Sequence, residues 1–256
     1  MRSVSKGSST RMIKGILRIV SAIDGGKSRT KLFNLSIKLK SFKPRETFSQ
    51  FGEDAVLSFF LHEKNGGYLD VGAGHFRNGN NSYSFYKRGW TGICVEPIPK
   101  LYDLLKQKRP HDSVIQKVIS RTPKKINFYE FDPYEYSTSD PEVVVKLEQA
   151  GIFPIDKFEV DSISINDLGL KIQPTEPYFL TVDCEGRDVE IVKSINFQQF
   201  CPRVICCEVY PVDAGGRHEL ESFLKDKNYR LMSICVFSLI FVHEEYLRAQ
   251  GWSRYI

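Results

Sequence analysis

Residues 67–74, with the sequence GYLDVGAG, constrain the fold of this chain more than any other stretch. They combine an apolar run that contains Asp70 with a glycine-rich turn, and a second apolar run at 91–96 ends in Glu96. A strand, a tight glycine loop, a helix and a strand ending in a carboxylate form a nucleoside-binding half-fold. Glycine lets the backbone approach a ligand closely, and Glu96 can accept hydrogen bonds from both ribose hydroxyls. The pattern therefore predicts a site for an adenosine-containing cofactor.

Strand-like and helical patterns alternate along residues 46–256. The expected strands are 67–71, 91–96, 113–119, 126–131, 158–165, 178–183, 203–209, 229–235 and 237–242. The expected helices are one that Ser49 caps and that ends near 65–67, then 81–87, 100–108, 141–149, 187–194 and 217–226. The last two strands are too close in sequence for a parallel crossover, so they must be antiparallel. These elements predict an α/β fold with a Rossmann-like, doubly wound, mostly parallel sheet and one antiparallel closing strand.

Charge divides the chain into a basic N-terminal extension, residues 1–45, and a body, residues 46–256. The extension holds twelve Lys or Arg and one acid, for a net charge of +11, whereas the body holds 24 basic and 30 acidic residues, for a net charge of −6. Nucleic-acid-binding domains carry positive charge on the folded surface. The acidic body therefore argues against a nucleic-acid partner.

The extension contains one helical pattern. Ile13, Ile16, Leu17 and Val20 repeat at helical spacing over residues 11–23, with basic residues on another face. Such a helix either docks on its own domain or contacts an anionic membrane surface, and we expect a basic linker at 24–45. The 11–23 run is interrupted by charge and falls short of the ~20 residues that a membrane span needs.

Six cysteines indicate a reducing compartment rather than a metal centre. None forms a C-x-x-C pair, and most lie in apolar, strand-like runs. Buried reduced thiols fit this arrangement, and the ligand spacing of a zinc site is missing. Together with the lack of a secretory signal pattern, this predicts a cytoplasmic protein, peripheral to the inner face of the membrane if the basic helix binds there.

The glycine loop favours S-adenosylmethionine over a dinucleotide such as NAD. A dinucleotide fingerprint needs a third glycine, and Arg77 occupies that position after Gly72 and Gly74. S-adenosylmethionine has no pyrophosphate to cradle, and the closing antiparallel strands fit the sheet of its transferases better than that of a dehydrogenase. An NAD-dependent oxidoreductase and a non-catalytic, membrane-associated nucleoside-binding module stay open as alternatives.

Four ordered blocks resemble the FkbM-type methyltransferase family. They are SQFGED at 49–54, YLDVGA at 68–73, KRGWTGICVEP at 87–97 and FLTVDCEGRDVEIV at 179–192, the last similar to the I-D-x-E-G-x-E-x-x-V/L segment of that family. The resemblance covers roughly residues 46–256. It implies a class I methyltransferase-like domain that uses S-adenosylmethionine to methylate a hydroxyl oxygen on a sugar, polysaccharide precursor or related small molecule. The chain departs from the commoner pattern at His75 and Cys184.

The expected cofactor site follows from the strand ends. Asp70 is expected to hold the methionine amino group directly or through water, Gly72, Ala73 and Gly74 to form the close turn, and Glu96 to bind the ribose. The resemblance implies that Gln50, Glu53 and Asp54 border the pocket. Ser120, which ends the third strand, is expected near the adenine.

Three candidates for acid–base chemistry lie where the transferred methyl group must be. Asp183 ends the fourth strand of the nucleotide-binding sheet, where it is expected to contact the cofactor and to act with Glu185 as the catalytic carboxylate pair, and His75 is a second base. No metal is predicted, although Asp183, Glu185 and Glu208 are the expected ligands if a divalent cation activates the hydroxyl. Residues 132–156 are aromatic and irregular, which is typical of a lid. Four of them, Tyr134, Tyr136, Ser137 and Thr138, are expected to line the acceptor pocket.

Overall fold

The computed structural model describes residues 46–171, 178–210 and 215–251. The predicted helix at 11–23 and the basic linker at 24–45 lie outside these residues. The described residues, Glu46 excepted, belong to the second of two units, Thr47–Ile256. Among them, every helix is too short or too polar to cross a lipid bilayer.

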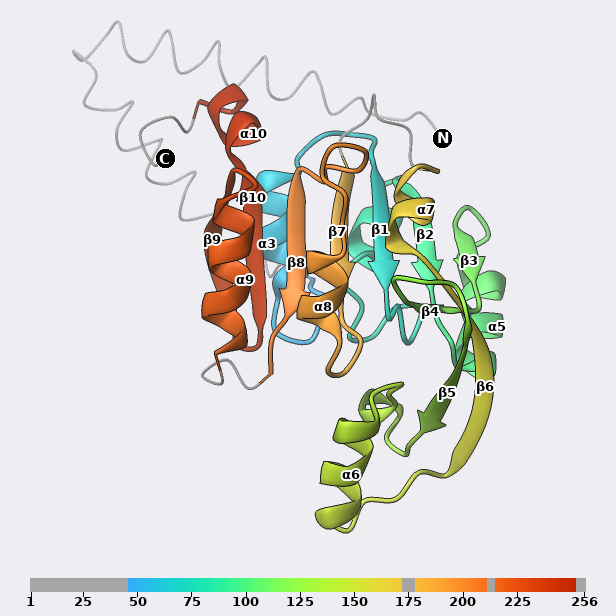
Figure 1. Ribbon diagram of the computed structural model, residues 1–256. Coiled ribbons are helices and arrows are strands. Elements are labelled where there is room, and N and C mark those ends of the chain that lie inside the picture. The colour runs from blue at the N-terminus through green and yellow to red at the C-terminus, as the bar shows by residue number, and fades with distance from the viewer. Residues whose placement is uncertain (1–45, 172–177, 211–214, 252–256) are drawn as a thin grey trace, which may run out of the picture. The chain divides into compact units, whose positions relative to one another are not determined.

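A seven-stranded sheet forms the centre of this unit (Figure 1). Its order is β3-β2-β1-β7-β8-β10-β9, and only β10 runs against its neighbours. The strands are β1 (Gly67–Val71), β2 (Thr91–Val95), β3 (Ser113–Ile115), β7 (Tyr178–Val182), β8 (Val204–Glu208), β9 (Tyr229–Cys235) and β10 (Ser238–His243). This confirms the predicted mostly parallel sheet with one antiparallel closing strand.

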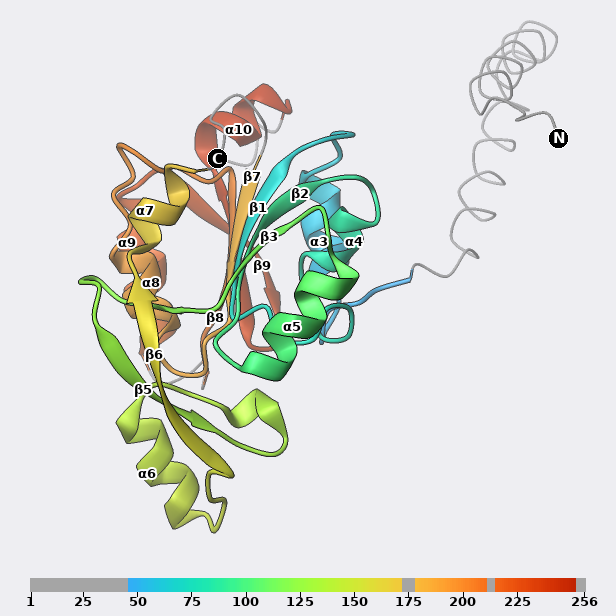
Figure 2. The same ribbon diagram turned by 90° about the vertical axis from the view of Figure 1, so that its right-hand side faces the viewer.

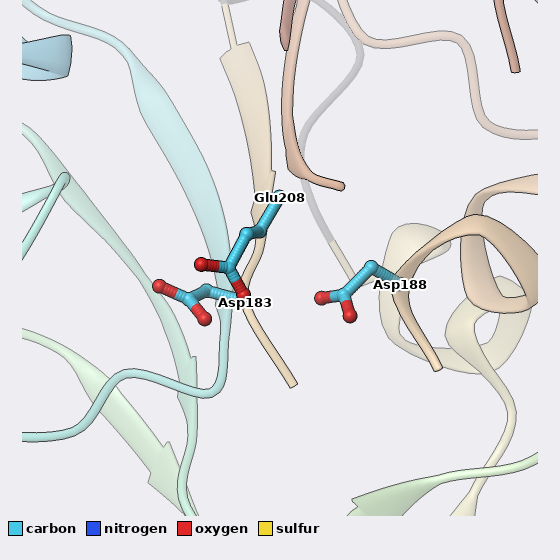
Figure 3. A group of neighbouring side chains, drawn as sticks. All are labelled: Asp183, Asp188 and Glu208. Atoms are coloured by element: carbon cyan, nitrogen blue, oxygen red, sulfur yellow. The ribbon is translucent and has the colours of Figure 1, made fainter. Parts of the chain in front are cut away.

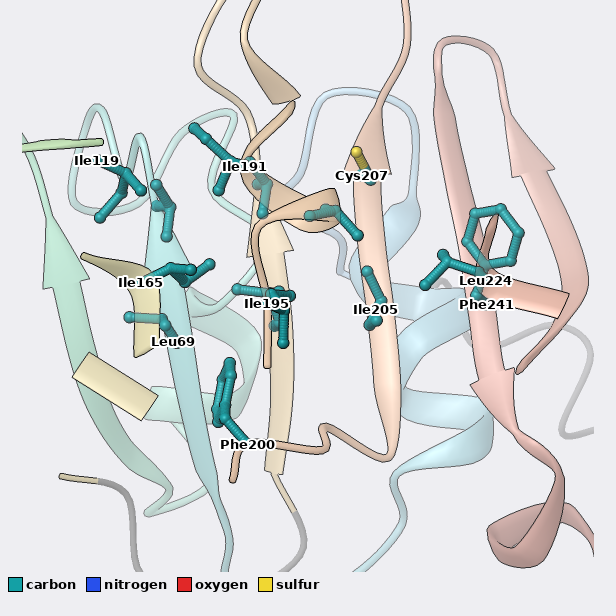
Figure 4. Packing of buried hydrophobic residues seen from close by; sticks show 14 of the residues in the cluster. Leu69, Ile119, Ile165, Ile191, Ile195, Phe200, Ile205, Cys207, Leu224 and Phe241 are labelled. Atoms are coloured by element: carbon teal, nitrogen blue, oxygen red, sulfur yellow. The ribbon is translucent and has the colours of Figure 1, made fainter. Parts of the chain in front are cut away.

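Helices cover both faces of the sheet, as Figure 2 shows edge-on. One layer contains α3 (Glu53–Phe60), α4 (Tyr83–Tyr86), α5 (Pro99–Lys108) and α10 (Glu244–Ala249), and the other contains α7 (Ile165–Gly169), α8 (Asp188–Lys193) and α9 (Gly216–Lys225). Alternate residues of a strand point to opposite faces. Accordingly Tyr68 packs with the first layer, whereas Leu69 and Val71 pack with the second. Figure 4 shows part of this second cluster, with Leu69 labelled.

A second, three-stranded sheet extends beyond the main one and was not anticipated. It has the order β4-β6-β5, with β4 (Val118–Ile119), β5 (Lys125–Glu130) and β6 (Asp156–Ile163). The predicted strand 113–119 therefore divides, because its first half pairs with β2 and its second half with β6. Between β5 and β6 lie the 3₁₀-helix η1 (Tyr134–Tyr136) and α6 (Pro141–Gln149). We call residues 125–163 the arm.

Two helix boundaries differ from the sequence prediction. The first helix begins after Gly52, whose φ of 87° leads into α3, and it ends at Phe60 rather than near 65–67. Ser49 is not its N-cap, but the Ser49 hydroxyl accepts a hydrogen bond from the Asp54 amide at 3.1 Å. The left-handed conformation of Gly52 moves the start of α3 three residues past Ser49. The Ser49 hydroxyl therefore accepts a hydrogen bond from an amide of the first helical turn while lying outside the helix.

A buried ionic network lies between β1, β2 and the first helical layer. The Arg109 side chain is fully buried, and its Nε donates to Asp112 Oδ2 at 2.6 Å. Its other nitrogens donate to the Tyr68 hydroxyl, Ser82 Oγ and Asn80 Oδ1 at 2.8, 2.8 and 3.1 Å. One guanidinium therefore links the end of α5 to β1 and to the segment that follows the glycine loop.

Replacing Arg109 by leucine should lower the free energy of unfolding by about 3–5 kcal/mol, because Asp112 would remain as an unpaired buried carboxylate. Chemical denaturation of the two proteins measures the difference. Arg248→Leu is the matched control: the Arg248 side chain is exposed, and Glu244 keeps a second ion pair with Arg230, so the loss should be less than about 1 kcal/mol. Equal losses in the two variants would show that the buried network is not a major source of stability.

Candidate functional site

A cavity of about 530 Å³ opens where the parallel strands β1, β2, β7 and β8 end. Sites of roughly 300–1,000 Å³ are typical for small molecules, and in open α/β sheets they lie outside the carboxyl ends of the strands. The loops after these strands line the cavity, and the arm contributes Tyr134–Ser137 and Ser139. The cavity therefore lies where the sequence predicts the site, at the carboxyl ends of the strands. Residues from the segment 132–156 contribute to its lining.

The glycine loop forms one wall of this cavity. The amides of Gly72 and Ala73 donate to the Val95 carbonyl at 3.0 and 3.1 Å, which ties the loop to the end of β2. Gly72 has a φ of 77°, and a Cβ at this position would lie 1.7 Å from the Asp183 carbonyl oxygen. Only glycine fits there, so the backbone of β1 meets the backbone that follows β7 directly beside the cavity.

Glu96 lies on the cavity wall next to this loop. It is 3% exposed, and its carboxylate accepts hydrogen bonds from the Gly74 amide and the Ile98 amide, both at 2.8 Å. Burial raises the Glu96 pKa to about 7, against the opposing effect of these two amides. The carboxylate is therefore held in one orientation, and each oxygen keeps a lone pair for a further donor such as a ribose hydroxyl.

Asp70 does not line the cavity, although it was predicted to hold the cofactor. Strand alternation turns it to the same face as Tyr68, where its Oδ2 accepts from Ser82 Oγ at 2.5 Å and from Asn80 Nδ2 at 3.2 Å. Asn80 Nδ2 also donates to the Ala73 carbonyl at 2.8 Å. In this structure Asp70 therefore supports the glycine loop from behind, through Asn80.

The other predicted cofactor residues divide into two groups. Gln50 lines the cavity, whereas Glu53 is buried and accepts from the Phe51 amide at 2.8 Å. Ser120 is buried, its amide donates to Ile163, and it does not line the cavity. The apolar side chains that line this end of the cavity instead are Ile98, Val118, Ile119 and Phe128. Sequence reasoning missed them because β4 and β5 belong to a sheet that it did not predict.

Three carboxyl groups, those of Asp183, Asp188 and Glu208, converge near the ends of β7 and β8 (Figure 3). Asp183 follows β7, Glu208 ends β8 and Asp188 begins α8, and one ligand oxygen from each lies within 4.8 Å of the others. Burial and the neighbouring Glu208 raise the Asp183 pKa well above its ordinary value, and burial and Glu185 raise that of Glu208 to about 8. One oxygen of Asp183 and one of Glu208 lie within 4.8 Å of each other, so ionising both carboxyl groups at once is unfavourable.

The loop between Asp183 and Asp188 is held in an unusual conformation. Glu185 has a φ of 52°, and its carbonyl accepts from Thr138 Oγ1 of the arm at 2.9 Å. Asp188 accepts from the Cys184 and Gly186 amides at 2.6 and 3.1 Å. The carboxyl group of Glu185 lines the cavity, and burial and Asp183 raise its pKa to about 9. The compact acidic cluster therefore contains Asp188, whereas the predicted possible metal set contained Glu185.

His75 also lines the cavity, but its geometry favours a structural role. Its Nδ1 accepts hydrogen bonds from the Arg77 and Asn78 amides at 3.2 and 3.0 Å. Burial and Arg77 lower the His75 pKa. A neutral ring whose Nδ1 accepts carries its proton on Nε2, so it presents a donor to the cavity rather than a base. The arrangement favours Asp183 over His75 for proton removal.

The sheet order, the glycine loop after β1 and the acid after β2 define a nucleoside-binding α/β domain of the class I methyltransferase type. The chain matches the family model described as Methyltransferase FkbM domain over residues 70–231, and it belongs to that family. This confirms the family predicted from the sequence. It also identifies the chain as a methyltransferase domain whose methyl donor is S-adenosylmethionine, in place of the alternative NAD.

Solved structures with a similar fold are distant in sequence. They include a TehB-like SAM-dependent methyltransferase from Corynebacterium glutamicum, with 10% identity, 86% of this chain and 100% of that chain covered and a TM-score of 0.38. A second is the 1,6-didemethyltoxoflavin-N1-methyltransferase from Burkholderia thailandensis, with 9% identity, 94% and 90% coverage and a TM-score of 0.40. A third is an O-methyltransferase from Bacillus cereus, with 11% identity, 89% and 96% coverage and a TM-score of 0.35. No curated protein matches the chain.

Gly72→Ala should abolish binding of S-adenosylhomocysteine, because the new Cβ would overlap the Asp183 carbonyl and force β1 and β7 apart. Isothermal calorimetry measures this loss, and circular dichroism reports whether the variant still folds. Gly151→Ala is the matched control: Gly151 has a similar φ of 81°, but a Cβ there meets open space. That control should cost only the roughly 1–2 kcal/mol of a left-handed residue and leave binding intact. Unchanged binding by Gly72→Ala would contradict the close approach.

The acidic cluster should make the protein less stable as pH rises from 6 to 8. The Glu208 pKa is raised to about 8 from an ordinary value of 4.5. The stability that this carboxyl contributes is therefore complete below about pH 4.5 and is lost as pH approaches 8. Urea denaturation across this range measures the slope, which Glu208→Gln should flatten. Glu142→Gln, on the exposed surface of α6, should leave the slope unchanged; a similar slope in all three proteins would contradict this origin.

Proposed function

We propose that this protein transfers the methyl group of S-adenosylmethionine to a hydroxyl oxygen of a sugar, a polysaccharide precursor or a related small molecule. The observation that carries the proposal is the close, half-buried pair of Asp183 and Glu208, which lies in the same cavity as the glycine loop and Glu96. A hydroxyl group must lose its proton when it is methylated, and a carboxylate beside the reacting oxygen can accept it. O-methylation is therefore a reaction that these carboxyl groups can assist.

The residues of the cavity fit this donor. The close turn at Gly72 exposes backbone to the cavity, and the Glu96 carboxylate is oriented by two amides beside it, where it would bind the ribose hydroxyls. The apolar side chains of Ile98, Val118 and Phe128 would enclose the adenine. When bound, the donor supplies an electrophilic methyl group on a positively charged sulfur, so the hard chemistry belongs to the donor.

The protein itself would position the reactants and accept one proton. Asp183 is the proposed base: it would take the hydroxyl proton as the new carbon–oxygen bond forms and the carbon–sulfur bond breaks. Burial raises its pKa and makes it a stronger base than an exposed aspartate. Glu208, which lies beside Asp183, raises the Asp183 pKa further. Positioning of the two reactants can remove roughly 7–11 kcal/mol of the barrier.

We also propose a location for the protein: the cytoplasm, with peripheral contact to the inner face of the membrane. Of the six cysteines, which fall in described segments, none forms a disulfide, in keeping with the predicted reducing compartment. The basic extension, residues 1–45, carries the proposed peripheral contact with an anionic membrane. Methyl transfer itself is assigned to residues 46–256.

Two substitutions separate donor binding from chemistry. Glu96→Ala should weaken binding of S-adenosylhomocysteine roughly tenfold to hundredfold, because it removes the carboxylate oxygens that would accept hydrogen bonds from the ribose hydroxyls. Asp183→Ala should bind this product nearly as the unchanged protein does, yet lose methyl transfer. Calorimetry measures the first effect, and transfer of radiolabelled methyl to a panel of saccharides measures the second. Full transfer by Asp183→Ala would exclude it as the base, and unaltered binding by Glu96→Ala would exclude the ribose contact.

A further inference from the structure

Three aromatic side chains form a cluster at the rim of the cavity, which we call the aromatic rim: Phe51, Tyr210 and Phe237. Phe237 makes edge-to-face contacts with Phe51 and Tyr210, with ring centroids 5.5 and 4.9 Å apart. Phe237 and Tyr210 line the cavity. Tyr210 is 72% exposed and Phe51 41% exposed, so large aromatic faces are directed to solvent at the entrance.

The backbone fixes the rim beside the acidic cluster. The Val209 amide donates to the Phe237 carbonyl at 2.8 Å, and Ser238 pairs with Glu208 across β10 and β8. Tyr210 therefore lies two residues after Glu208 along the chain, and Phe237 lies next to the residue that pairs with Glu208. Glu208 in turn lies beside Asp183. An acceptor that rests on the rim can reach the proposed base.

The turn that carries Phe237 is strained and apolar. Val236 and Phe237 connect β9 to β10, and Val236 has a φ of 54° while being 51% exposed. Two-residue hairpin turns favour Asn-Gly or similar pairs, because branched residues are strained at positive φ. Strain and exposed apolar surface thus occur together at this turn, where a polar, unstrained turn would serve the fold better. Such outliers are concentrated at ligand sites.

We propose that Phe51, Tyr210 and Phe237 form the acceptor subsite, and that it takes the apolar face of an uncharged sugar ring. This inference rests on the proposed function and deepens it by naming the residues that select the acceptor. Aromatic faces bury a large flat area with little loss of side-chain freedom. The ring hydroxyls that point away from the rim would meet the carboxyl groups of the cavity.

Charge disfavours an anionic acceptor at this position. Glu135, Asp183, Glu185 and Glu208 line the cavity together with the basic Lys117 and Arg187, and Arg187 is already paired with Glu190. A phosphate group brought among the carboxyl groups would make their ionisation, including that of the proposed base, still less favourable. An acyl chain would also fit poorly, because it offers no hydroxyl donors to the buried carboxylates.

The rim, rather than Tyr134 of the arm, is assigned to the acceptor. The Tyr134 ring approaches the glycine loop: a Cβ on Gly74 would lie 3.4 Å from its Cε2. Tyr134 therefore lies at the donor end of the cavity, whereas Tyr210 lies two residues after Glu208, at the end of the acidic cluster. The two aromatic groups serve different reactants.

The test uses the full chain, radiolabelled S-adenosylmethionine and a panel of methyl glycosides of glucose, galactose, mannose, fucose and rhamnose, with the 6-phosphates of the first three. Transfer to at least one neutral glycoside, and to none of the phosphates, is expected. Tyr210→Ala and Phe237→Ala should each raise the KM for that glycoside about tenfold or more, as for truncation of a central aromatic contact. Their affinity for S-adenosylhomocysteine should stay within twofold of the original.

Two further variants keep the result interpretable. Phe59→Ala removes a phenyl ring that is 55% exposed on α3, away from the cavity lining, and should change neither quantity. Tyr210→Leu guards against misfolding, since it keeps an apolar side chain but loses the flat ring, and it should also raise the KM. Melting temperatures measured by circular dichroism confirm that each variant folds.

Three outcomes would overturn the subsite: an unchanged KM in folded Tyr210→Ala and Phe237→Ala, transfer to the phosphates at the same rate, or transfer to no glycoside at all. If the chain binds S-adenosylhomocysteine but methylates no glycoside, the subsite and the sugar acceptor fail while the methyltransferase assignment stands. If it also fails to bind that product, the proposed function fails as a whole.

Discussion

The contact between Gly72 and the Asp183 carbonyl is the constraint on which the site depends. It brings the turn after β1 against the residue after β7, so the backbone of the donor loop and the backbone of the proposed base are in direct contact. Their separation is then fixed by strand pairing rather than by flexible side chains, because β1 and β7 pair in parallel up to Val71 and Val182. A transfer reaction in which two reactants must be aligned benefits from such a rigid reference.

Acidic side chains outnumber the basic Lys117 and Arg187 on the cavity wall. The raised pKa values of Asp183, Glu185 and Glu208 indicate that the folded chain resists ionising all of these carboxyl groups at once. A positively charged donor would offset this repulsion, whereas its neutral product would not. The acidic groups that raise the Asp183 pKa would therefore also favour replacement of the bound product by a new molecule of S-adenosylmethionine.

Most of the fold could be predicted because hydrophobic periodicity and glycine turns report local structure. The seven-stranded sheet, its reversed strand and the positions of Glu96 and Asp183 at strand ends followed from that logic. The second sheet could not be predicted in this way, since the division of 113–119 between two sheets is a tertiary choice. For the same reason the placement of Asp70 behind the loop, of Ser120 outside the cavity and of Asp188 in the acidic cluster required coordinates. Phe51, Tyr210 and Phe237 are far apart in sequence, and nothing in their local patterns indicates that they meet.

The hydrogen bond from Thr138 to the Glu185 carbonyl joins the arm to the acidic loop. Thr138 is itself fully buried and bridged to Tyr129 of β5, so it moves only with the arm. A displacement of the arm would release a residue held at positive φ and let the loop relax. Mutations at the outer end of the arm can therefore alter turnover from a distance, and directed evolution of this enzyme should find productive changes there.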